Sequence, residues 1–186
     1  VAERARMTCI VGVETKTGAY IGADSFIGSA TYADSKASAK VFSRNGWTIG
    51  VAGSARFANL LEHVFEWPQA PTTDDMGAVV RVAIDIGKAA AADDLCFSAS
   101  SGQRSLESEL MLVAAGRIYT GASNLGMYRS RRGYAAIGSG DQYALGALHA
   151  TKDQPPRARV LAALRAAAAH ASTVTGPFRI LRITKT

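Results

Sequence analysis

The stretch that decides the fold is "TCIVGVETKTGAYIGADS", residues 8–25. Its two halves, 8–14 and 19–25, are rich in β-branched and aromatic residues, and the polar turn between them contains Gly18. That composition predicts an antiparallel hairpin. The segment "SAKVFSRNGWTIGVAG", residues 38–53, repeats the design around Asn45-Gly46, which is the strongest short hairpin signal. The chain therefore opens with two hairpins.

The remainder of the chain alternates pairs of helices with groups of strands. Ser54 is the expected N-cap of the first helix and Thr73 opens the second. We expect helices over 54–67, 72–93, 141–152 and 155–172, a polar loop over 98–109, a hairpin over 110–122, and strands over 133–140 and 176–184. Consecutive helix pairs exclude the alternation of a parallel doubly wound sheet, and they favour antiparallel sheets with helices in separate layers.

Composition and charge narrow the classes of function. A chain of 186 residues with 48% hydrophobic and 19% charged residues fits one globular domain. The formal charge of +6 permits an acidic partner, but the 21 Lys and Arg residues are scattered. Their densest group, Arg129, Arg131 and Arg132, is expected to be a solvated loop or a subunit contact rather than a phosphate site. Nucleic-acid binding is therefore not favoured.

Cysteine usage and hydropathy indicate a cytoplasmic protein. Two cysteines, Cys9 and Cys96, are too few for a disulfide framework in a chain of this length, and we expect both to be buried and reduced. The first seven residues lack the apolar core of a secretory signal. No run approaches the roughly 20 apolar residues of a membrane span, so we expect no membrane association.

Three polar residues stand at the ends of predicted strands. Thr8 starts the first strand, Asp24 ends the second and Lys40 opens the third. Taken singly, each has an ordinary explanation, because Asp is a turn former and a lysine at a strand end is usually solvated. If the two hairpins are neighbours in one sheet, however, Asp24 and Lys40 can both approach Thr8.

Together these residues have a chemical logic. A threonine hydroxyl becomes a useful nucleophile when a base takes its proton, and a terminal α-amine, with a pKa of about 7.7 to 8, can be that base. The Lys40 ammonium would disfavour protonation of the amine, and the Asp24 carboxylate would hold the lysine in place. The scheme requires Thr8 to be the amino terminus, because an amide nitrogen is not a base.

The chain resembles the β-type subunits of the proteasome family, most closely HslV-like peptidases and their phage-borne relatives, among the N-terminal nucleophile hydrolases. Residues 8–25 resemble the family's opening "TTIVAV…IAGDG", and Asp24 and Lys40 follow Thr8 by 16 and 32 residues (24 − 8 and 40 − 8), as in the family. "IGVAGS" resembles the turn whose backbone N–H forms the oxyanion hole, which implies that role for Gly53. "AIGSGDQYALGAL" resembles "AIGSGGPYA" and implies an active-site role for Ser139. The resemblance spans most of residues 8 to 178.

This resemblance implies an α+β fold, a four-layer αββα sandwich of two antiparallel sheets with helices outside. It implies hydrolysis of peptide bonds in a polypeptide substrate through an acyl-enzyme on Thr8 Oγ1, with catalytic residues Thr8, Asp24, Lys40 and Ser139. Subunits would form a homo-oligomeric ring with the sites facing an enclosed chamber. HslV works with an ATP-dependent unfoldase, although no sequence feature here identifies such a partner. The chemistry requires no metal or cofactor, and we expect none.

The chain departs from the family pattern at two places. Met7 stands where precursors usually carry a glycine, and "AAAAHASTVTGPF" stands where family members often place an aspartate and then a serine. That segment offers His170, Ser172, Thr173 and Thr175, and the sequence does not decide which of them completes the outer part of the site.

Residues 1–7 are expected to be an N-terminal extension or propeptide before a single domain of residues 8–186. If translation starts at Met7, a methionine aminopeptidase would expose Thr8, because threonine is small. While the extension remains attached, the enzyme should be inactive.

Two other functions fit parts of the pattern. One is a ring-forming structural homologue without activity. Such a protein would have no physical need for a lysine beside a buried amino terminus. The other is an amidohydrolase of the same class that acts on small amides, which an open pocket would favour over an enclosed chamber. Peptide specificity is expected to come from the loop near residues 26–36 and from "GVAGSARF", residues 50–57.

Overall fold

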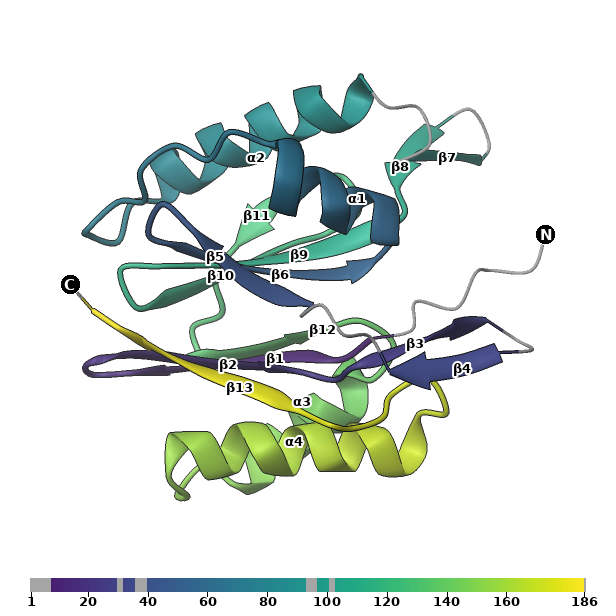
Figure 1. Ribbon diagram of the computed structural model, residues 1–186. Coiled ribbons are helices and arrows are strands. Elements are labelled where there is room, and N and C mark those ends of the chain that lie inside the picture. The colour runs from purple at the N-terminus through teal and green to yellow at the C-terminus, as the bar shows by residue number, and fades with distance from the viewer. Residues whose placement is uncertain (1–7, 30–31, 36–39, 93–96, 101–102, 186) are drawn as a thin grey trace.

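The computed structural model describes residues 8–29, 32–35, 40–92, 97–100 and 103–185, so the expectations for residues 1–7 and for Cys96 fall outside the described part. Two antiparallel sheets pack face to face between two helical layers (Figure 1). Helices α1 and α2 cover one sheet, and α3 and α4 cover the other. The predicted four-layer αββα sandwich is confirmed.

The first sheet has the strand order β12-β1-β2-β13. Its strands are β1 (Ile10–Thr15), β2 (Gly18–Ala23), β12 (Tyr134–Ile137) and β13 (Arg179–Thr184). In the register, Ile10 lies opposite both Ala23 and Ile137. The residues that precede β1 and those that follow β2 and β12 are therefore brought together at the same end of the sheet.

The second sheet has the order β11-β10-β9-β6-β5. Its strands are β5 (Val41–Arg44), β6 (Trp47–Gly53), β9 (Ser108–Ala114), β10 (Arg117–Gly121) and β11 (Met127–Tyr128). The two opening hairpins are not neighbours in one sheet, which was the condition set for Asp24 and Lys40 to approach Thr8. Instead, β1–β2 and β5–β6 belong to different sheets that face each other. A Cβ atom at Gly50 would lie 3.0 Å from Ile10 Cγ2 across the interface. Each hairpin buries its apolar inner face against the other.

The helices differ in detail from the sequence prediction. They are α1 (Ala55–Asn59), the π-helical turn η1 (Leu60–Val64), α2 (Met76–Ala91), α3 (Asp141–Ala150) and α4 (Pro156–His170). Ser54 caps α1 as predicted, accepting a hydrogen bond from Phe57 N. The expected helix over 54–67 ends early, and Val64 is 69% exposed, because the Trp67 indole turns back to donate to Leu61 O at 2.7 Å. Asp75 rather than Thr73 caps α2.

The core follows the alternation of the strands. Along β1 and its preceding residue, Cys9, Val11 and Val13 pack under α3 and α4, whereas Ile10 packs between the two sheets. Cys9 is a free, fully buried thiol, as predicted, and burial raises its pKa to about 12. A third apolar cluster, which includes Trp47, lies under α1 and α2.

Two small hairpins were not predicted. They are β3 (Phe26–Ser29) with β4 (Tyr32–Ser35), and β7 (Phe97–Ser100) with β8 (Gln103–Leu106). The prediction of a polar loop over 98–109 is therefore wrong. Backbone pairing forms this hairpin, and its polar sequence lacks the apolar alternation by which a strand is recognised.

The far end of β1 carries an ion cluster that joins the two sheets. The Glu14 carboxylate accepts hydrogen bonds from Ile118 N, Arg117 and Arg129. Burial alone would raise the pKa of Glu14, but the Arg129 hydrogen bond and the other donors hold it below its ordinary value. Arg129, which also pairs with Asp74, is 31% exposed and links the two sheets, whereas Arg131 and Arg132 are exposed in the same loop.

In the described part of the chain, no helix has both the length and the apolar run that crossing a bilayer requires.

Candidate active site

Four chain segments converge at one edge of the sandwich. Thr8 precedes β1, Asp24 follows β2, Lys40 precedes β5 and Ser139 follows β12. Lys40 Nζ donates to Thr8 Oγ1 at 3.0 Å, and it lies 3.0 Å from each carboxylate oxygen of Asp24. The structure therefore brings together the four residues that the sequence predicts. Thr8, Asp24 and Ser139 flank strands of the first sheet, and Lys40 comes from the facing sheet.

Asp24 is held rigidly from two sides. Its side chain is fully buried, and its two oxygens accept hydrogen bonds from Cys9 N at 2.9 Å and Phe26 N at 3.0 Å in addition to those from Lys40. Burial raises the pKa of Asp24 above its ordinary value, while the Lys40 charge and the two backbone donors oppose the rise. Loss of the carboxylate charge would leave the Lys40 ammonium without its buried counter-ion, which is costly.

Lys40 can act on Thr8 in two ways. Its side chain is only 9% exposed and is directed by Asp24 toward Thr8 Oγ1. A cation at hydrogen-bonding distance stabilises the oxygen as its proton leaves. The same charge disfavours the protonated form of an amine on Thr8, so that the amine would be available as a base.

The turn after β12 approaches the Thr8 backbone closely. Gly138 has φ +92°, and a Cβ atom there would collide with Thr8 O. Ser139 Oγ accepts from Thr8 N at 3.4 Å, and Gly140 N donates to Thr8 O at 3.3 Å. From the facing sheet, Glu109 Oε2 accepts from Gly138 N at 2.7 Å. Both sheets therefore fix the position of this turn.

The sequence left the outer part of the site open among four residues at and after the end of α4, and the structure brings Thr173 to it. Thr173 Oγ1 lies 2.7 Å from Ser139 Oγ. His170 instead stacks beside Tyr143, and Ser172 and Thr175 are exposed. No sequence pattern distinguishes Thr173 from its neighbours, because its position depends on the geometry of the turn that ends α4.

Gly53 ends β6 at the same edge of the molecule. Its φ is +125°, and a Cβ atom would collide with Glu107 O, so the backbone requires glycine here. The preceding residue, Ala52, lies 3.3 Å from the Cβ position of Gly138, which puts the end of β6 beside the Ser139 turn. The role of Gly53 N–H as an oxyanion donor stays a prediction.

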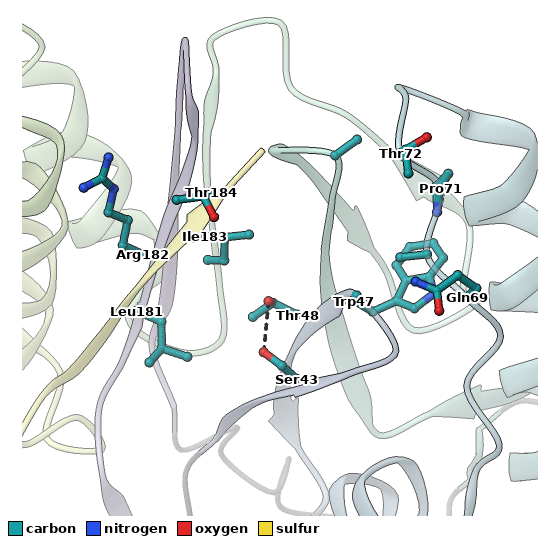
Figure 2. Close-up of a pocket in the computed structure, with 13 residues that line it drawn as sticks. Ser43, Trp47, Thr48, Gln69, Pro71, Thr72, Leu181, Arg182, Ile183 and Thr184 are labelled. Carbon is teal, nitrogen blue, oxygen red and sulfur yellow. Dashed lines mark hydrogen bonds between the residues drawn. The ribbon is translucent and has the colours of Figure 1, made fainter. Parts of the chain in front are cut away.

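A cavity of about 390 Å³ lies at the opposite end of the sandwich. Figure 2 shows its walls, which come from the β5–β6 turn, residues 69–72 and β13, with the Ser43 and Thr48 hydroxyls 3.1 Å apart. Ser43 and Thr48 lie toward the turn end of β5 and β6, whereas Lys40 and Gly53 lie at the other end. This cavity is thus separate from the Thr8 group.

Solved structures with the same fold come from several organisms. No protein-family model and no curated protein matches the sequence. BPH from Thiobacillus denitrificans has a TM-score of 0.82 at 19% identity, with 96% of this chain and 99% of that chain covered. The same protein has also been solved in complex with epoxomicin, with a TM-score of 0.80.

HslV from Trypanosoma brucei has a TM-score of 0.69 at 17% identity, over 95% of this chain and 99% of that chain. Anbu, described as an ancestral β-subunit, from Yersinia bercovieri has a TM-score of 0.65 at 13% identity, over 96% and 88%. These neighbours share the fold along nearly the whole chain, and they include HslV, to which the sequence resemblance points.

Proposed function

We propose that this chain is a threonine-type peptidase in which Thr8, as the amino-terminal residue, is the nucleophile. The observation that carries the proposal is the 3.0 Å hydrogen bond from Lys40 Nζ to Thr8 Oγ1, with Lys40 held in turn by the buried Asp24. Burying the Lys40 ammonium and the Asp24 carboxylate costs free energy, because both charges lose their hydration. A threonine with a purely structural role would not require this buried ion pair beside its hydroxyl. The fold shared with HslV agrees with this reading.

In the acylation step, the Thr8 amine takes the proton of Oγ1 while the oxygen forms a bond to the carbonyl carbon of the substrate. The carbonyl electron pair moves to its oxygen, and Gly53 N–H stabilises that oxyanion. Removal of one such donor in a comparable site costs about 2.7 to 4 kcal/mol. The carbon–nitrogen bond then breaks, and the ammonium of Thr8 gives its proton to the leaving amine.

In the deacylation step, water attacks the ester on Thr8 Oγ1 and gives a proton to the Thr8 amine. The ester bond breaks, the acid product leaves, and the proton returns to Oγ1. Lys40 stabilises the developing charge on Oγ1 in both steps, and Asp24 keeps Lys40 charged. Every proton lost by a nucleophile is thus returned within the cycle, and no metal or cofactor is needed.

Residues 1–7 are proposed to be absent from the active form. With residue 7 attached, Thr8 N is an amide whose hydrogen points to Ser139 Oγ, and it has no lone pair available as a base. Exposure of Thr8 therefore acts as the activation step.

Homo-oligomeric assembly, with the sites facing an enclosed chamber, is the second part of the proposal. Met76, Val80 and Ile84 recur every four residues on α2 and are 38%, 40% and 53% exposed, although the opposite face of this helix is buried. Such an apolar stripe is typical of a surface that another subunit covers. One structure with this fold is described as a helical assembly of the Anbu complex from Pseudomonas aeruginosa.

Substitution of Thr8 tests the chemistry directly. We expect Thr8→Ala to abolish hydrolysis of a fluorogenic peptide and Thr8→Ser to retain part of it, since a serine supplies the same hydroxyl and amine. Thr17→Ala, in the exposed β1–β2 turn, is the matched control and should behave as wild type. Undiminished turnover in Thr8→Ala would reject the proposal.

A further inference from the structure

We infer that Thr173 is a positioning residue that orients Ser139 toward the amino terminus of Thr8. The inference rests on the proposed function, because it gives Thr173 a role in keeping the terminal amine ready as a base. It concerns the part of the site that the sequence leaves open.

The contacts of Ser139 Oγ are unequal. The oxygen lies 2.7 Å from Thr173 Oγ1, 3.3 Å from Thr8 O and 3.4 Å from Thr8 N. A distance of 2.7 Å is the usual length of a good hydroxyl–hydroxyl hydrogen bond, whereas the other two are long. Thr173 is therefore the partner that determines the orientation of the Ser139 side chain.

The proton count explains why that orientation matters. A serine hydroxyl has one proton to donate and two lone pairs to accept with. The Thr8 amine must keep its lone pair directed at Oγ1, so its N–H bonds need acceptors. Ser139 can donate this proton to Thr173 Oγ1 at 2.7 Å or to Thr8 O at 3.3 Å. When it donates across the shorter contact, to Thr173, its lone pairs face the amine, and Ser139 serves as an acceptor for both the neutral and the protonated amine.

The segment that carries Thr173 is anchored on both sides. Val174 N closes a turn on Ala171 O at 3.1 Å, and the Val174 side chain is buried against Gly140, one residue beyond Ser139. Thr175 O accepts a hydrogen bond from Ser25 N, directly after Asp24. The Thr173 hydroxyl is thus supported by the same elements that hold Ser139 and Asp24.

Thr173 supports the amine without adding charge. Among the described residues, the charged side chains near the Thr8 terminus include Lys40 and Asp24, then Glu109 on β9, which accepts from Gly138 N, and Asp141 at the start of α3. A carboxylate at position 173 would add an anion on the Ser139 side and favour the ammonium form of the amine. A hydroxyl leaves the amine deprotonated at lower pH.

The test is a set of variants at position 173, studied in protein whose mass confirms an exposed Thr8. We expect Thr173→Val to lower kcat about tenfold with little change in KM, which corresponds to loss of one hydrogen bond. The acid limb of its kcat/KM profile should move to lower pH. Without Thr173 as a partner, Ser139 is a weaker acceptor and stabilises the Thr8 ammonium less. Thr173→Asp should move the acid limb to higher pH. Thr173→Ser, which keeps the hydroxyl, should have the kcat and the acid limb of the wild-type enzyme.

Thr175→Val makes the same chemical change on an exposed residue two positions away and should behave as wild type. Equal kinetics for Thr173→Val and Thr175→Val, or an acid limb that does not move in Thr173→Asp, would overturn the role of Thr173. Thr8→Ala is measured in parallel. If it loses activity while the position-173 variants match wild type, only the present inference fails; if it stays active, the proposed function fails as well.

Discussion

After Thr8, Lys40 is the residue whose replacement should lower the rate of hydrolysis most. Lys40→Met keeps much of the side-chain length but removes the cation between Thr8 and Asp24. We expect kcat to fall by roughly 10²- to 10³-fold, because one electrostatic contact to the reacting oxygen is lost. The measurement is the initial rate of peptide hydrolysis.

Lys88→Met is the control for this experiment. Lys88 is an exposed lysine whose carboxylate partner, Asp85, is also exposed, so its removal should leave the rate unchanged. A Lys40→Met enzyme as active as the Lys88→Met enzyme would show that the ammonium has no part in catalysis.

The individual site residues were predictable to different degrees. Asp24 and Lys40 were found because they are polar residues at the ends of predicted strands, and the family resemblance matched their intervals of 16 and 32 residues from Thr8. Thr173 was not identified, because a turn after a helix can present any of several polar side chains. The ion pairs of Arg129 were not predicted, because its partners, Glu14 and Asp74, are remote in sequence.

At the scale of elements, the Glu14 cluster should make the joint between the sheets sensitive to pH. The pKa of Glu14 is lower in the folded protein than its ordinary value of about 4.3. Its stabilising contribution is therefore complete above that ordinary value and is lost as the pH falls through the lowered pKa. Glu14→Gln should remove this pH-dependent contribution.

Denaturant unfolding at pH 7 and below pH 4 measures this effect. We expect Glu14→Gln to lower the free energy of unfolding at pH 7 by about 2 kcal/mol, in the range for hydrogen bonds to a charged group. The difference from wild type should shrink in acid. The exposed Glu66→Gln is the control, and a loss in Glu14→Gln that stays constant with pH would contradict the account.

Elements were predicted well where periodicity or turn chemistry was strong. The Asn45-Gly46 hairpin, with φ of 44° and 82°, and the α4 helix formed as expected. The helix over 54–67 was predicted too long, because the Trp67 indole turns back to donate to Leu61 O instead of continuing the helical pattern. The β7–β8 hairpin was missed because it is formed by backbone pairing, and backbone pairing produces no recognisable pattern in a polar sequence.

At the scale of the whole molecule, the two opening hairpins face each other rather than lying side by side. The site is therefore a junction between sheets, with Thr8 and Asp24 on one and Lys40 on the other. The sequence placed these residues at the ends of predicted strands. It could not show which sheet each hairpin joins, since both hairpins have an apolar face.

The exposed stripe on α2 leads to a prediction about assembly. Ile84→Glu places a charge in the centre of the proposed interface, and we expect it to shift the protein to smaller species in sedimentation or light scattering. Gln154→Glu adds the same charge on an exposed loop and should leave the mass unchanged. An unaltered assembly in Ile84→Glu would remove α2 from the interface.

The most direct test of the central claim is to locate the covalent label of a threonine-directed inhibitor on active protein. The account predicts a peptide that begins at Thr8 and carries the label on that residue, with residues 1–7 absent from the active material. Label on another residue, or full activity with residues 1–7 still attached to Thr8, would contradict it.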